Sequence, residues 1–185
     1  MVRKAFVLAG IALLWVTTSA AGQSIAPLRF GVALGTALGG GQWWWPDGGH
    51  AALSLTSQQV GSRFGLRVEA MFDNNTDGAL GVDGSRNEWR HTTLSLTINT
   101  TYRLRGHQTG LYAIGGVGVY QRWNELRILD FRTGEEVRRS TGAGIDANVG
   151  LGYNFTAFGR EVFVESRLYG TTFLDRVPLS LGIRF

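Results

Sequence analysis

Cysteine is absent from this chain of 185 residues, proline occurs three times, and lysine occurs once, at Lys4. The lack of cysteine excludes disulfides, thiolate metal sites and a cysteine nucleophile. No apolar run approaches the roughly 18 residues of a membrane-spanning helix. Glycine, by contrast, occurs 27 times, about twice its usual share of ~7%. A composition rich in glycine and poor in proline is unlike that of a linker or a helical bundle and indicates strands with a curved or crowded backbone.

The first 21 residues have the three parts of a secretory signal peptide. Arg3 and Lys4 form a basic start, an apolar run follows, and small residues precede a polar exit. We therefore predict cleavage after Ala21 and a single mature domain at residues 22–185. That domain keeps 16 of the 18 basic side chains, since Arg3 and Lys4 are lost, against 14 acidic ones. Its net charge is only +2, and no nucleic-acid partner is expected.

Apolar and polar residues alternate with a period of two over most of the mature domain, which is typical of strands with two different faces. Leu66 and Val68, for example, flank Arg67. Most segments approach the 9–11 residues of a tilted membrane strand. In the glycine-rich fifth segment the pattern does not assign the two faces. The eight segments lie near residues 30–38, 51–56, 64–72, 93–102, 111–120, 143–155, 162–169 and 177–185.

The connectors between these segments alternate in length. Residues 39–50, 73–88 and 121–139 are long and polar, 57–62, 103–109 and 156–160 are short, and the last connector, near 170–176, is brief. Long loops on one side and tight turns on the other are typical of outer-membrane barrels. The sequence therefore predicts an all-β chain that forms an eight-stranded antiparallel up-and-down transmembrane β-barrel, with short turns and both termini in the periplasm.

A soluble eight-stranded barrel, such as a lipocalin-like carrier, is the alternative, and it would bury the apolar face. Alternation alone does not decide, because outward charges are cheap in water. Aromatic residues at strand ends, such as Phe64 and Phe72, suit the girdles of a membrane barrel. Together with the asymmetric connectors and a last strand that ends on Phe185, they favour the membrane barrel.

Three segments carry a resemblance to a known family: residues 177–185 (VPLSLGIRF), 112–120 (YAIGGVGVY) and 164–169 (VESRLY). With them, residues 25–185 resemble the small eight-stranded outer-membrane barrels of the OmpA/OmpX type, barrel domain only. The resemblance implies that Phe185 is part of a signal read by the outer-membrane assembly machinery. The family's peptidoglycan-binding domain has no counterpart here, so cell-wall tethering is not inferred.

Charged side chains on the polar face of the strands are the most informative candidate residues. An eight-stranded barrel is only just wide enough for side chains, so charges inside must pair with each other or with water. We predict a polar network that closes the lumen, the alternative being a gated pore built from the same groups. The members of this network are Arg67, Glu69, Asp146, Glu165, Arg167 and Arg184.

Residues 121–139 carry five arginines and four acidic residues around a Thr133-Gly134 turn signal. Such a pattern predicts that the flanking strands continue above the membrane as a hairpin, whose edge can pair with other proteins. Adhesion or contact with lipopolysaccharide phosphates is the functional interpretation, and a solvated hairpin of mixed charge is the simpler one. Residues 73–78 lack the ligand spacing of a calcium loop and are interpreted as a polar loop.

Three consecutive tryptophans in the first long connector suit either anchoring at the membrane–water boundary or a ligand platform. Together with two arginines of the third connector they form our candidate set of outer-loop contacts. The set consists of Trp43, Trp44, Trp45, Arg127 and Arg132.

Catalysis is considered because some eight-stranded outer-membrane barrels modify lipid A. The three histidines, His50, His91 and His107, are tied to no carboxylate by spacing, and no His-x-Ser pattern occurs. We therefore predict a non-enzymatic barrel without cofactor or metal, in a structural or surface-interaction role. A narrow channel for ions or small solutes and a lipid A-modifying enzyme remain alternatives. Expected partners are outer-membrane lipids, including lipopolysaccharide, and the assembly machinery; a closed barrel needs no partner in the membrane, so a monomer is expected.

Overall fold

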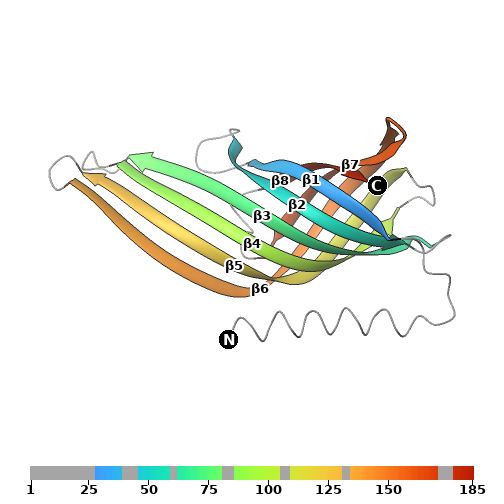
Figure 1. Cartoon of the computed structure of the whole chain (residues 1–185), viewed down its shortest axis with the longest axis horizontal. Helices are drawn as coiled ribbons and strands as arrows, with labels where there is room; N and C mark the ends of the chain where they lie inside the picture. The colour runs from blue at the N-terminus through green and yellow to red at the C-terminus, as the bar shows by residue number, and fades with distance from the viewer. Residues whose placement is uncertain are drawn as a thin grey trace.

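A computed structural model describes residues 28–38, 46–58, 62–80, 86–104, 109–130, 134–170 and 177–185. Neighbouring strands pair antiparallel in sequence order, and β1 also pairs with β8, so the sheet closes (Figure 1). The predicted eight-stranded antiparallel barrel is confirmed. The strands are β1 (Arg29–Leu38), β2 (Pro46–Gln58), β3 (Phe64–Leu80), β4 (Arg86–Arg103), β5 (Gly110–Asp130), β6 (Gly134–Ala157), β7 (Arg160–Tyr169) and β8 (Val177–Arg184).

The two faces of the barrel wall differ sharply in polarity. Inside, Arg67 and Glu165 are at most 1% exposed. Outside, Leu34, Val117 and Leu151 are all more than half exposed. Polar side chains therefore fill the interior and apolar side chains cover the outside, the reverse of a soluble carrier. In the described ranges, no helix has the length and apolar character needed to cross a membrane.

Aromatic side chains mark the height of the apolar outer surface. On β3 this surface runs from Phe64 to Phe72, eight residues apart. At ~3.3 Å per residue and a tilt of about 40°, it spans roughly 20 Å along the barrel axis, comparable with the ~25 Å apolar band of outer-membrane barrels. Phe64 packs against Tyr102 of β4, with ring centroids 4.9 Å apart.

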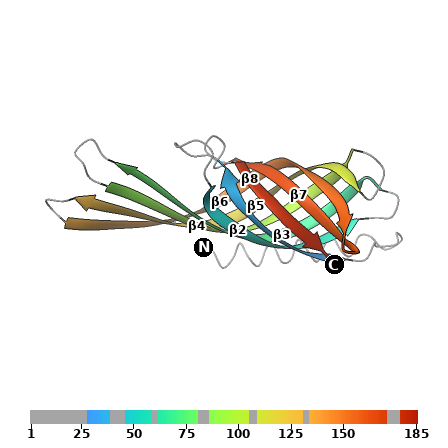
Figure 2. The ribbon, with the colours of Figure 1, turned by 90° about the horizontal axis from the view of Figure 1, so that it is seen from above.

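Strands β3, β4, β5 and β6 continue well beyond the other strands (Figures 1 and 2). Pairing of β2 with β3 ends at Gly48–Asn75, whereas β5 and β6 stay paired up to Asp130–Gly134. We call the part that extends past the barrel the protruding sheet. It comprises residues 76–80 of β3, 86–90 of β4, 125–130 of β5 and 134–139 of β6.

The structure confirms the hairpin predicted within residues 121–139 but corrects the neighbouring connector. Residues 73–88 are not a long polar loop, because β3 runs to Leu80, β4 begins at Arg86, and the two pair throughout. The strand is not visible in the sequence of this segment, because its residues are polar on both faces. A strand outside a membrane needs no apolar face. Backbone pairing with the hairpin next to it holds the segment extended. Residues 46–50 of the first long connector belong to β2.

The predicted short turn at residues 156–160 is confirmed as a two-residue hairpin. Phe158 and Gly159 join β6 to β7 with φ angles of 53° and 71°. Positive φ at both central residues is the conformation whose twist suits a tight hairpin. The Phe158 side chain is fully exposed.

Candidate functional site

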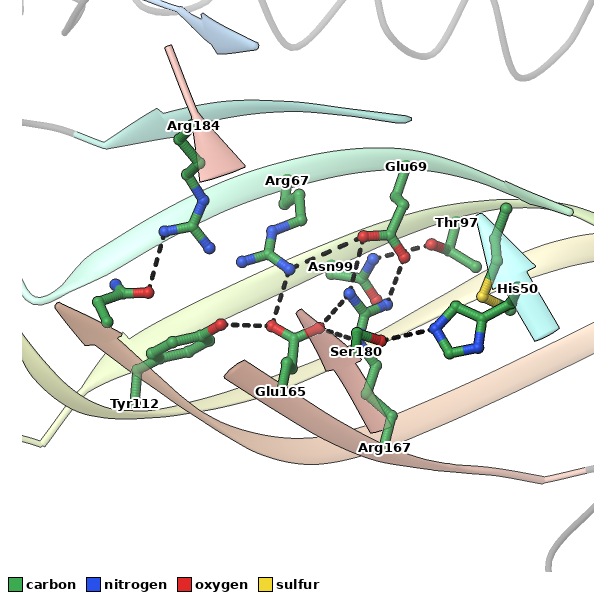
Figure 3. A network of polar contacts seen from close by, with 12 residues as sticks. His50, Arg67, Glu69, Thr97, Asn99, Tyr112, Glu165, Arg167, Ser180 and Arg184 are labelled. Carbon is green, nitrogen blue, oxygen red and sulfur yellow. Dashed lines mark hydrogen bonds and ion pairs between the residues drawn. The ribbon is translucent and has the colours of Figure 1, made fainter. Parts of the chain in front are cut away.

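Two arginines and two glutamates from opposite walls of the barrel meet in its interior (Figure 3). Arg67 and Glu69 come from β3, and Glu165 and Arg167 come from β7. All four are buried, with at most 5% of each residue exposed. Because strand residues two apart point to the same side, each strand contributes one cation and one anion to what we call the lumen quartet.

Charge-assisted hydrogen bonds join the two strands of the lumen quartet, since each arginine donates to a glutamate of the opposite strand. Arg167 donates to Glu69 with two nitrogens, at 2.6 Å from Nη1 to Oε1 and 2.8 Å from Nη2 to Oε2. Arg67 Nη1 donates to Glu165 Oε2 at 2.8 Å, and Arg167 Nε also donates to Glu165. Two positive and two negative charges cancel, which is the condition under which buried ions are tolerated.

Aromatic rings complete the closure beside the lumen quartet. The Tyr112 hydroxyl donates to Glu165 Oε2 at 2.5 Å. The guanidinium carbons of Arg67 and Arg184 lie 5.2 and 4.4 Å from the centroid of the Phe163 ring. Cations at this distance are attracted to the ring face. The four charges of the lumen quartet are thus paired and flanked by aromatic rings, whereas Nε and Nη2 of Arg67 and of Arg184 have no hydrogen-bond partner among the described residues.

A second ion group lies where the described chain begins and ends. Arg184 of β8 donates to Asn154 at 3.2 Å and forms an ion pair with Glu161. Arg29 of β1 pairs with the other oxygen of Glu161 at 2.7 Å. One carboxylate therefore connects the first, seventh and last strands across the seam at which the barrel closes.

His50 and Ser180 meet to one side of the lumen quartet (Figure 3). Gly35 of β1 stands between them in the strand register, and His50 Nε2 lies 2.8 Å from Ser180 Oγ. His50 Nδ1 is buried without a hydrogen-bond partner in the described part of the chain. The pair therefore lacks the orienting carboxylate that a serine–histidine nucleophile uses.

The structure brings five of the six predicted lumen residues into these two ion groups. Asp146 is half-buried beside Gly170, where the pairing of β6 with β7 ends, and the lumen quartet is complete without it. Sequence reasoning missed Tyr112 and Phe163, both buried in the lumen. The sequence signal for these two residues is a large aromatic side chain on one strand opposite a glycine on the next. Each ring lies over a glycine of the adjacent strand.

A substitution at Gly152, the glycine opposite Tyr112, tests how tightly the Tyr112 ring is packed in the lumen. Tyr112 pairs with Gly152, and a Cβ at that position would collide with the phenol ring. We expect Gly152→Ala to lower the free energy of unfolding by about 1–3 kcal/mol, because the ring must leave Glu165. Urea unfolding monitored by Tyr and Trp fluorescence measures the change. Gly142→Ala on the same strand, where no atom lies within 4 Å, is the matched control and should unfold with the parent; equal midpoints for both variants would contradict the packing described.

The protruding sheet carries its own charge pattern. Arg127, one of the predicted outer-loop contacts, pairs with Glu125 at 3.2 Å and with Glu135 at 3.3 Å. Glu125 also accepts a hydrogen bond from Arg139 at 2.9 Å. Hydrogen bonds from Arg139 and Arg127 lower the pKa of Glu125, so its carboxylate stays charged at neutral pH. The other predicted contacts, Trp43, Trp44, Trp45 and Arg132, lie outside the described residues.

Phe185 ends the described chain against the first strand. Its backbone N–H donates to the carbonyl oxygen of Phe30 at 2.8 Å. Arg160 lies over its ring, 5.3 Å from the centroid, and about half of the residue is exposed. The terminal aromatic is therefore presented on the outer surface at the seam.

No family model and no curated protein matches the sequence. The chain is similar to solved outer-membrane barrels. The attachment invasion locus protein Ail of Yersinia pestis has 12% identity and a TM-score of 0.46, over 88% of this chain and 99% of that one. The N-terminal β-barrel domain of Pseudomonas aeruginosa OprF has 9% identity and a TM-score of 0.48, over 88% and 100%. Neisserial surface protein A has 12% identity and a TM-score of 0.45, over 88% and 98%.

Proposed function

We propose that this chain is a bacterial outer-membrane β-barrel with a closed lumen, and that its protruding sheet makes contacts outside the cell. The main support for the proposal is the polarity of the barrel wall, which is polar inside and apolar outside. Buried Arg67 and Glu165 and exposed Leu34 and Leu151 suit a barrel surrounded by lipid. The signal peptide predicted at residues 1–21 would deliver the chain to the periplasm, and Phe185 would mark it for the assembly machinery.

The location is tested by electrophoresis of outer-membrane fractions in SDS, with and without boiling. A closed membrane barrel resists SDS until it is heated, so the unboiled protein is expected to migrate differently from the boiled protein. Unchanged mobility, together with recovery in the soluble periplasmic fraction, would contradict the proposal and favour a soluble carrier.

The paired charges and aromatic rings in the interior support a structural role over a channel. The lumen quartet and the rings of Tyr112 and Phe163 occupy the space that a solute would have to cross. We expect no discrete conductance steps from the purified barrel in planar bilayers. Repeated steps that change in Glu165→Gln or Arg167→Gln would contradict a closed lumen, since both variants alter the groups that line it.

Outer-leaflet lipopolysaccharide is the lipid partner that the charges favour. Strand register places Arg86, Arg90, Arg127 and Arg139 on the sheet face that continues the lipid-facing surface of the barrel. Guanidinium groups suit phosphate recognition. Three glutamates on the same face weaken the attraction of this face for phosphate. We therefore expect the face to contact lipid headgroups and not to modify them chemically. Mass spectra of lipid A from cells with and without the protein should be identical; a reproducible difference in acyl chains would indicate an enzyme instead.

A further inference from the structure

We propose that the exposed edge of β6 pairs with the β6 edge of a second copy of this chain, antiparallel and centred on Val137, and so joins barrels in two facing membranes. The inference rests on the proposed outer-membrane location and deepens it by naming the partner of the protruding sheet.

The β6 edge, residues 134–145, is a long strand edge with no backbone partner among the described strands. No described strand lies beside it, because the pairing of β6 with β7 ends at Asn148–Tyr169. On its other side, β6 stays paired with β5 without a register shift from Gly110–Asn154 to Asp130–Gly134. Residues 134–145 contain no proline, which would remove a backbone donor, and their charges at 135, 136, 138 and 139 limit which strands can pair with them. A continuous edge of this kind is a template for another strand.

The direction of the backbone groups allows a two-fold axis at Val137. Ala147 accepts a hydrogen bond from Gly170 at 2.8 Å, so its carbonyl points away from β5, toward the edge. Alternate residues of a strand share this direction, and Val137 lies ten residues away in an unshifted register. Its N–H and C=O therefore also point outward. Two copies can exchange both bonds at Val137, as a two-fold hydrogen-bonded pair requires.

The charges flanking Val137 are antisymmetric. The sequence reads Glu135, Glu136, Val137, Arg138, Arg139, and every one of these residues is exposed. With Val137 opposite Val137, Glu135 lies opposite Arg139 and Glu136 opposite Arg138, twice each. The paired side chains also lie on the same face of the joined sheet, because a two-fold axis perpendicular to the sheet leaves every side chain on the face from which it projects.

Neighbouring registers are opposed by the same charges. Centring the pair one residue earlier places Glu136 opposite Glu136, and one residue later places Arg138 opposite Arg138. Like charges directly opposite each other on neighbouring strands are destabilising. The charge order thus excludes slipped registers and selects a second copy over an arbitrary strand.

Antiparallel pairing fixes where the second barrel lies. The protruding sheet extends to one side of its barrel (Figure 2). The second β6 runs in the opposite direction, so its barrel lies beyond the tip of the first protruding sheet. Both barrels cannot share one membrane in this arrangement, since their outer ends face each other. The contact therefore joins two membrane surfaces.

Clustering of phosphatidylcholine vesicles that contain the purified protein tests the pairing. Wild-type vesicles are expected to cluster, measured by light scattering. Glu135→Arg/Glu136→Arg vesicles and Arg138→Glu/Arg139→Glu vesicles are each expected to lose clustering, because all facing charges become alike. A mixture of the two is expected to regain it, because each variant then complements the other. Arg63→Glu, at an exposed residue outside the protruding sheet, also makes the net charge more negative but away from the edge, and should cluster like the wild type.

A single cysteine provides a register test, since the chain has none. Val137→Cys lies on the two-fold axis and is expected to form a disulfide-linked dimer between vesicles under mild oxidation. Arg139→Cys lies two residues off the axis, so its two copies are separated by four residues, about 13 Å along the strand, too far for a disulfide. Equal cross-linking of the two variants would overturn the register.

The outcomes separate this inference from the proposed function. Each preparation is first checked for the heat-dependent mobility shift of an inserted barrel. An inserted wild-type barrel that does not cluster, or a charge-reversed variant that clusters alone, overturns the pairing and leaves the proposed function standing. A wild-type chain that fails to insert overturns the proposed function, and the inference with it.

Discussion

Replacing Arg167 by leucine is expected to lower the free energy of unfolding by about 3–5 kcal/mol, the usual cost of leaving a buried charge without its partner. Arg167 gives Glu69 two hydrogen bonds, and without it the nearest cation in the lumen quartet is Arg67, with 3.8 Å between Nη1 and Oε2. Glu165, in contrast, keeps Arg67 and Tyr112. Most of the expected cost therefore comes from Glu69.

Urea unfolding in lipid vesicles, monitored by the mobility shift in SDS, measures this loss. The double variant Glu69→Leu/Arg167→Leu is the control. It removes the orphaned carboxylate and leaves the pair of Arg67 and Glu165 intact, so it should be more stable than Arg167→Leu alone. A single variant that unfolds at the parent midpoint would show that the charges in the lumen are solvated.

Arginine in place of Val117 is expected to lower the free energy of unfolding by about 2–4 kcal/mol in a lipid bilayer. Val117 is 59% exposed on the outer face of β5, six residues from Leu111 and six from Trp123, which lie toward the two ends of the apolar surface. A guanidinium there must displace lipid at about the middle of the bilayer. In a soluble barrel the same side chain would meet water at little cost.

Phe158→Arg is the control, because it also places an arginine at an exposed apolar position, but in the turn between β6 and β7. It should unfold with the parent protein. Measured as urea midpoints in the same vesicles, equal stability of Val117→Arg, Phe158→Arg and the parent would mean that the apolar outer surface does not contact lipid.

The barrel and its polar interior could be predicted because period-two alternation is a local property. Most strands display their own two faces, and β3 and β7 each carry a cation and an anion two residues apart. The pairing partners could not be predicted, because residues 67 and 165 are brought together only by closure. The faces of β5 were hidden by glycine, which carries no side chain to mark a side. Tyr112 was missed for that reason.

The extent of the protruding sheet was only partly predictable. Residues 121–139 alternate between charged and apolar side chains, so their hairpin is visible in the sequence. Residues 73–80 are mostly small and polar, and nothing in their composition favours a strand. They are extended because a neighbouring strand is present to bond with them. Secondary structure of this kind depends on context and cannot be read from the segment alone.

The sequence distance between the partners of the lumen quartet has a consequence for how the barrel is made. The ion pair of Arg67 with Glu165 and that of Arg167 with Glu69 each span 98 residues. A partial barrel that lacked β7 would leave Arg67 and Glu69 with only their longer contact to each other, 3.8 Å from Nη1 to Oε2, and such a state is costly in hydrocarbon. In the outer-membrane barrel that we propose, insertion and closure would therefore be coupled, because β7 would have to arrive before β3 is left in lipid.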